Sequence, residues 1–278
     1  MFMNNKQSDL LKNIMNADRY FAEPVTPPFP QTLSMNALHS QNIKDAEGLV
    51  QFIIASPKPF EPSEIEKMSQ LKNIQIGLIS IMANHLAALK KEDNEAYYRP
   101  EHWLDTLNHL PLLGHNKIET KKLHKQTFDF SVAQAFIQLL LGAAINATSP
   151  ALGEFIDFLR TQGQKIEVGL RKSLDNYQTI TIAGITEILN HNNHLIFVPK
   201  LKILSLRFSY QSAKMLLASC IGRKFTLSLE YTTITSVFDA SALDDPLINQ
   251  QFYDFLNKYR QLSIAKSDAF FSGDFYLK

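Results

Sequence analysis

The residue with the clearest chemical potential is Cys220, the single cysteine of the chain. It directly follows the apolar stretch Met215 to Ser219 and comes just before Gly222, Arg223 and Lys224. A lone thiol cannot form an internal disulfide. It is therefore either an inert small hydrophobe in the core or a group kept for its sulfur chemistry.

The spacing around the cysteine bears on which chemistry is feasible. If residues 211–221 are helical, Ala213, Leu216, Leu217 and Cys220 share one apolar stripe, and Gly222 ends the helix. Apolar burial and the negative end of the helix dipole both disfavour a thiolate. Such a thiol suits a hydrophobic adduct better than fast redox chemistry. Three interpretations stay open: inert core residue, acylated cysteine and thiol catalyst.

Other chemical signatures are weak. The sequence has no G-x-G-x-x-G, P-loop, H-E-x-x-H, G-x-S-x-G or C-x-x-C motif. The candidate metal ligands are two groups of histidines, namely His191 with His194, and His102, His109 and His115 around Trp103. Zinc needs three or four ligands with closing geometry, and a histidine pair in an asparagine-rich turn is typical of a solvated hairpin. We therefore expect neither a metal nor a bound cofactor.

Two pairs of carboxylates could be taken for acid–base catalysts. Glu154 and Asp157 lie near an expected helix start, where acidic side chains stabilise the positive end of the dipole. Asp244 and Asp245 precede Pro246 and match a helix N-cap. Structural roles are expected for both pairs.

Composition sets broad limits. The 278 residues are 45% hydrophobic, and 28 basic against 27 acidic side chains give a net charge of +1 without long blocks of like charge. This balance shows no electrostatic footprint for nucleic acid. The polar amino terminus does not match a secretory signal, so synthesis in the cytoplasm is expected. Two charge-free segments, 73–89 and 130–153, favour buried core helices over membrane spans.

Periodicity changes along the chain. Helical spacing is found over residues 7–21, 65–89, 132–147, 152–170 and 246–259, and two-residue alternation starts near residue 177. The turn 191–194 favours antiparallel pairing, and the aromatic tail 270–276 is best explained as a final strand. The sequence predicts a single α+β domain over residues 1–278. Its helical part, about 7–170, packs on a mainly antiparallel sheet from about 177–278, with a C-terminal helix.

Length, the order of helices and strands, and the single cysteine in Leu216-Leu217-Ala218-Ser219-Cys220-Ile221-Gly222 together give a resemblance. The chain resembles the Erwinia virulence factor Evf family, bacterial proteins of about this size linked to infection of the insect gut. The resemblance implies a palmitoyl group joined through a thioester to the matching residue, Cys220. It also implies that this palmitoyl group lies inside the protein, so that segments 73–89 and 130–153 are candidate walls of a lipid cavity.

The expected partner is therefore a fatty acid. A single acyl chain gives only marginal membrane anchoring, and the sequence has no polybasic patch to help it, so a mostly buried acyl group is favoured over a peripheral association with the membrane surface. The alternative is an acyltransferase or thioesterase that uses an acyl-Cys220 intermediate, with one of the eight histidines as its base. Neither the base nor a host partner is identified by the sequence.

Overall fold

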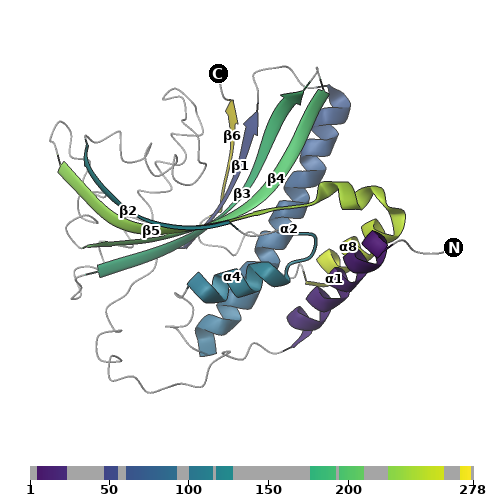
Figure 1. Ribbon diagram of the computed structural model, residues 1–278, viewed down its shortest axis with the longest axis horizontal. Helices are drawn as coiled ribbons and strands as arrows, with labels where there is room; N and C mark the ends of the chain where they lie inside the picture. Colours follow the sequence, from purple (N-terminus) through teal and green to yellow (C-terminus); the bar gives the residue numbers. More distant parts are fainter. Residues whose placement is uncertain are drawn as a thin grey trace.

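The computed structural model describes residues 5–23, 47–55, 61–92, 100–114, 117–127, 176–191, 194–209, 225–259 and 270–276. Within these ranges four α-helices accompany one sheet (Figure 1). The helices are α1 (Asn5–Ala22), α2 (Pro62–Glu92), α4 (Pro100–His109) and α8 (Pro246–Tyr259), and a short 3-10 helix, η3 (Ala240–Asp244), precedes α8.

The sheet has six strands in the order β2-β5-β4-β3-β1-β6. Its strands are β1 (Glu47–Ala55), β2 (Lys117–Thr127), β3 (Asn176–His191), β4 (His194–Ser209), β5 (Phe225–Val237) and β6 (Phe270–Tyr276). β2, β5, β4 and β3 pair antiparallel, whereas β1 pairs in parallel with β3 and with β6. Figure 1 shows the strong twist of the sheet, with β2 and β5 running across the directions of β1 and β6.

The predicted α+β class is confirmed, and so are most of the predicted elements within the described residues. The expected first and long second helices are α1 and α2, and the C-terminal helix has the predicted bounds, Pro246–Tyr259. The aromatic tail forms β6, and residues 191 and 194 close the β3–β4 hairpin. The predicted helices 132–147 and 152–170 lie outside the described residues.

The amino-terminal half is predicted to be the helical part, but it also contributes two strands, which the sequence did not indicate. β1 and β2 both come from that half and lie in the same sheet as the later strands. The partners of β1 are β3 and β6, which lie far along the chain, so no local turn signal marks β1 as a strand. β2 is lysine-rich and forms an edge strand, where charged side chains discourage pairing with another chain.

Local chemistry explains where α8 begins. The carboxylate of Asp245 accepts hydrogen bonds from the backbone N–H groups of Leu247 (2.9 Å) and Ile248 (3.2 Å). Pro246 occupies the first helical position, where its missing N–H has no cost. The N-cap role predicted for this aspartate is confirmed.

The core lies around α2. This helix crosses one face of the sheet and contacts β3 and β4 (Figure 1). α4 and α8 pack against it, and α1 lies against α8 and α4. Leu78, Ile79 and Met82 are at most 1% exposed. None of the helices in the described part of the chain combines the length and the apolar character that a membrane crossing requires.

Candidate functional site

Cys220 falls in residues 210–224, outside the described residues, so the structure reports only on what flanks it. The flanking strands are β4, which ends at Ser209, and β5, which begins at Phe225. These strands are antiparallel neighbours. The segment that carries the thiol therefore connects adjacent strands at one end of the sheet.

The second charge-free segment, 130–153, also lies outside the described residues, between β2 and β3. The residues that flank this connection, Thr127 and Asn176, pair directly with Phe225 and Ser209. All four residues therefore lie at the same end of the sheet. The chain around Cys220 and the charge-free chain 130–153 leave the described structure from this shared end.

The first charge-free segment, 73–89, belongs to α2 and is packed on two sides by protein. Towards the sheet, a Cβ added to Gly184 of β3 would lie 3.2 Å from the Cβ of Gln75 and 3.3 Å from Ile79. Towards α8, a Cβ on Gly77 would lie 2.7 Å from Leu256. These close approaches explain why charge is absent from this part of the helix.

The amide of Gln75 anchors α2 to the sheet. Its Nε2 donates to the carbonyl oxygens of Ile185 (3.0 Å) and Lys200 (3.1 Å), and its Oε1 accepts from the hydroxyl of Thr186 (3.2 Å). Gln75 is 1% exposed. A buried polar side chain with its donors and its acceptor all used fixes the position of the helix on the strands.

Among the residues that the structure describes, no group of three or more potential metal ligands comes together. His191 and His194 are paired backbone positions where the β3–β4 hairpin closes. His102 is 6% exposed, and its carbonyl oxygen accepts a hydrogen bond from Thr106. His115 lies outside the described residues, as do Glu154 and Asp157.

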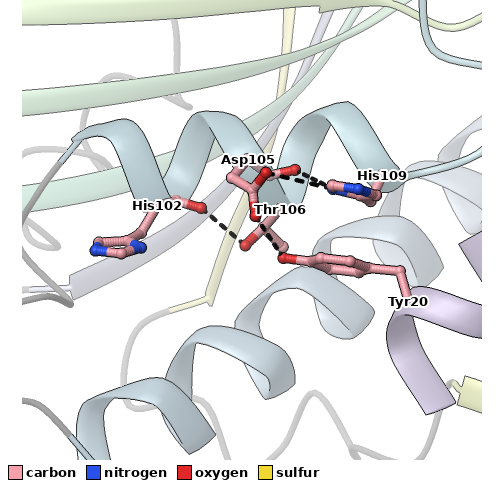
Figure 2. A network of polar contacts seen from close by, with 5 residues as sticks. All are labelled: Tyr20, His102, Asp105, Thr106 and His109. Carbon is pink, nitrogen blue, oxygen red and sulfur yellow. Dashed lines mark hydrogen bonds and ion pairs between the residues drawn. The ribbon is translucent and has the colours of Figure 1, made fainter. Parts of the chain in front are cut away.

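A polar and aromatic cluster instead joins α1, α2 and α4. We call it the three-helix cluster, and it consists of Tyr20, His85, Asp105 and His109. The hydroxyl of Tyr20 donates to Asp105 Oδ2 at 2.9 Å, and the Tyr20 ring stacks on the imidazole of His109 with centroids 3.7 Å apart and planes within 5° (Figure 2). The Nδ1 of His109 lies 2.8 Å from the carbonyl oxygen of Asp105, which assigns the Nδ1 proton to that contact.

His85 lies beneath the end of α1. Its ring centroid is 4.9 Å from that of Tyr20 and 5.3 Å from that of Phe21. Burial lowers the pKa of His85 to about 4; Asp105 opposes this shift and His109 adds to it. Burial also raises the pKa of Tyr20, with Asp105 adding to the effect. At neutral pH the cluster therefore contains a neutral imidazole and a protonated phenol.

These protonation states limit the chemistry of the cluster. The protonated Tyr20 serves as a hydrogen-bond donor and is a poor nucleophile, while His85 stays neutral until the solution is acidic. The arrangement suits a response to protons better than covalent catalysis. His109 is among the histidines that the sequence offers as candidate ligands, whereas its partners in this cluster were not predicted. The i, i+4 spacing of Asp105 and His109 could have indicated their contact, whereas nothing local connects either residue to Tyr20.

A second set of charges lies on the sheet face that alternation places opposite α2. Lys200 Nζ contacts Glu187 Oε2 at 2.7 Å, and Lys117 contacts Glu119 at 2.8 Å. Lys202 belongs to the same set of charges. Burial lowers the pKa of its ammonium group to about 8, although the negative charge of Glu119 acts to raise it. Hydrophobic periodicity alone does not predict this charged band.

Comparisons with known proteins bear on the family and the fold. A family model described as virulence factor Evf matches residues 42–275. The structure of the Evf virulence factor superposes with a TM-score of 0.72 at 14% identity, over 83% of this chain and 87% of that one. This agreement confirms the family resemblance and the fold. No curated protein sequence matches.

Two further structures match with much lower scores. The activated Cyt2Ba monomer from Bacillus thuringiensis subsp. israelensis gives a TM-score of 0.34 at 13% identity, over 69% of this chain and 97% of that one. A delta-endotoxin gives 0.36 at 13% identity, over 78% and 90%. Scores this low carry no structural argument.

Proposed function

The chain belongs to the virulence factor Evf family, and on that premise we propose that it is a virulence protein S-acylated on Cys220, with a palmitoyl-length chain held mainly inside the protein. The observation that carries this proposal is the family match over residues 42–275, a range that includes Cys220. Since Cys220 is the single thiol of the chain, a thioester has no alternative position.

The topology of the sheet supports the same proposal. The segments 210–224 and 128–175 begin and end at one end of the sheet. An acyl chain that starts at Cys220 would therefore leave from the end where the charge-free stretch 130–153 is connected. The other charge-free stretch, 73–89, is already packed between strands and helices, so 130–153 is the stronger candidate for lining an apolar slot.

Burial of the acyl chain is favoured on energetic grounds. Each buried methylene contributes roughly 0.8 kcal/mol, so a long chain adds several kcal/mol when even part of it leaves water. One acyl chain on its own binds membranes marginally and reversibly. We therefore propose the acyl group as part of the core, with membrane association as a secondary consequence of its exposure.

Intact-mass measurement tests the modification directly. Protein purified from a bacterial host that acylates it should carry the mass of one fatty acyl group, which hydroxylamine removes. Cys220→Ser is the matched control and should show the bare mass. A bare mass for the wild-type protein from such a host would refute the proposal.

Thermal unfolding tests whether the acyl chain is a core element. Acylated wild type should melt several degrees above both Cys220→Ala and hydroxylamine-treated wild type, because removal of the chain leaves a dry cavity. Replacement of an inert cysteine costs only about 1 kcal/mol. Equal melting temperatures for all three proteins would place the acyl chain outside the core.

A third measurement separates a structural thioester from an enzymatic intermediate. Acylated protein is incubated with water, alcohol and amine acceptors while its mass is followed. A thioester that persists for days supports the structural role. Rapid transfer to one acceptor class would instead indicate an acyltransferase or thioesterase.

A further inference from the structure

Helix α1 is distinct from the rest of the fold because it lies before the range that the family model matches, 42–275. Its apolar side nevertheless belongs to the core: Ile14 and Ala17 are buried, and Leu10, Leu11 and Phe21 pack against the same cluster. The sequence before residue 42 thus supplies a helix that packs on α8 and α4. Its last turn also reaches α2 through the rings of Tyr20 and Phe21, which contact His85.

Polar contacts hold α1 along its length. Gln7 donates to Asp245 at 2.9 Å near the first turn, and the carbonyl oxygen of the Asn13 side chain accepts from the backbone N–H of Leu112 at 2.8 Å. Near the last turn, Lys258 of α8 contacts Asp18 at 2.7 Å. The hydrogen bond to Lys258 lowers the pKa of Asp18, so this ion pair persists into acid.

The last turn of α1 also covers His85. Tyr20 and Phe21 place their rings against this imidazole, and Phe21 continues to Phe255 of α8 with an edge-to-face contact at 5.9 Å. Among the residues that the structure describes, the titratable groups around His85 are Tyr20 from α1 and Asp105 and His109 from α4. On the α8 side, Tyr259 lies against Phe21, and Lys258 pairs with Asp18.

We propose that α1 is an acid-sensitive clasp, in which protonation of His85 releases the carboxyl-terminal half of α1 (residues 14–22) from α2 and α4 while α8 and the sheet remain folded. The released state uncovers the imidazole and lets water reach it.

The sign of the pH effect follows from the two states of the imidazole. In the closed state burial lowers the pKa of His85 to about 4, whereas an uncovered histidine has the ordinary value of 6.5. The open state therefore binds the proton more tightly, and opening increases as the pH falls through the window from 6.5 to about 4. At pH 5 the opening constant should exceed its value at pH 7.5 on the order of tenfold.

Hydrogen exchange followed by mass spectrometry tests the clasp in the full-length protein. Labelling times at pH 7.5 and pH 5 are scaled for the intrinsic exchange rate. Peptides from residues 14–22 should lose protection at pH 5 by on the order of tenfold. Peptides from α8, residues 246–259, should keep theirs.

Two variants complete the test. His85→Gln removes the titrating group and should abolish the acid response of residues 14–22, with His85→Phe as the substitute should the glutamine variant fail to fold. His194→Gln, at an exposed histidine of the hairpin, should respond like wild type. The proposal is overturned when residues 14–22 keep their protection at pH 5, when α8 opens with them, or when the His85 variants respond as strongly as wild type.

Discussion

Gln75 and His85 lie ten residues apart on α2, and each is covered by a different partner. Gln75 faces the sheet, is 1% exposed and has hydrogen bonds to Ile185, Lys200 and Thr186. His85 is covered by aromatic rings of α1, and burial lowers its pKa to about 4. The amide of Gln75 cannot take up a proton, whereas the imidazole of His85 can. The difference indicates a helix that is fixed to the sheet on one side and held conditionally by α1 on the other.

The largest effect is expected at the fixed side. Gln75→Ala should lower the free energy of unfolding by about 3 kcal/mol, because it removes three hydrogen bonds and leaves a cavity. Chemical denaturation should give the same loss at pH 7.5 and pH 5.5. Gln75→Met preserves most of the volume and should lose less, and equal losses for both variants would mean that packing contributes little.

The titrating side should show a smaller effect that depends on pH. The His85 pKa is lower in the folded protein than in the unfolded chain, so the stabilisation is complete above 6.5 and decreases towards about 4. After allowance for partial exposure, wild type should lose about 1 to 2 kcal/mol over this window relative to His85→Gln. Parallel stability–pH curves for the two proteins would show that His85 titrates normally in the fold.

At the amino-terminal end of α1, we expect a loss of stability that depends on the Asp245 carboxylate. Asp245 caps α8 with one carboxylate oxygen and accepts from Gln7 with the other. Asp245→Ala should cost about 1 kcal/mol, whereas Asp245→Asn keeps a capping oxygen and should cost less. Melting temperatures of the two variants measure the difference. A similar loss for both would assign the effect to the contact with Gln7.

The smallest effect is expected from the hydroxyl of Tyr20. Tyr20→Phe keeps the ring stacked on His109 and removes the hydrogen bond to Asp105, so it should cost roughly 0.5 kcal/mol. Hydrogen exchange should register the change in residues 14–22 before global unfolding does. A loss above that of Gln75→Ala would reverse the ranking of the two contacts.

Periodicity predicted the elements whose patterns are local. The 3.6-residue spacing over residues 7–21 and 65–89 indicated α1 and α2, and Asp245 with Pro246 indicated the start of α8. Alternation of apolar and polar residues indicated β3, β4 and β5. The single thiol also directed attention to Cys220, whose acylation remains a prediction.

What only the tertiary structure decided depends on partners far apart in sequence. β1 is a strand because β3 and β6 pair with it. The lysine-rich β2 is a strand because it pairs with β5. The same holds for the three-helix cluster, in which Tyr20 and Asp105 are 85 positions apart. The types and spacing of residues encode the surface that each element offers. Which surfaces meet, and hence which imidazole is buried and which carboxylate accepts a phenol, is decided when the chain packs.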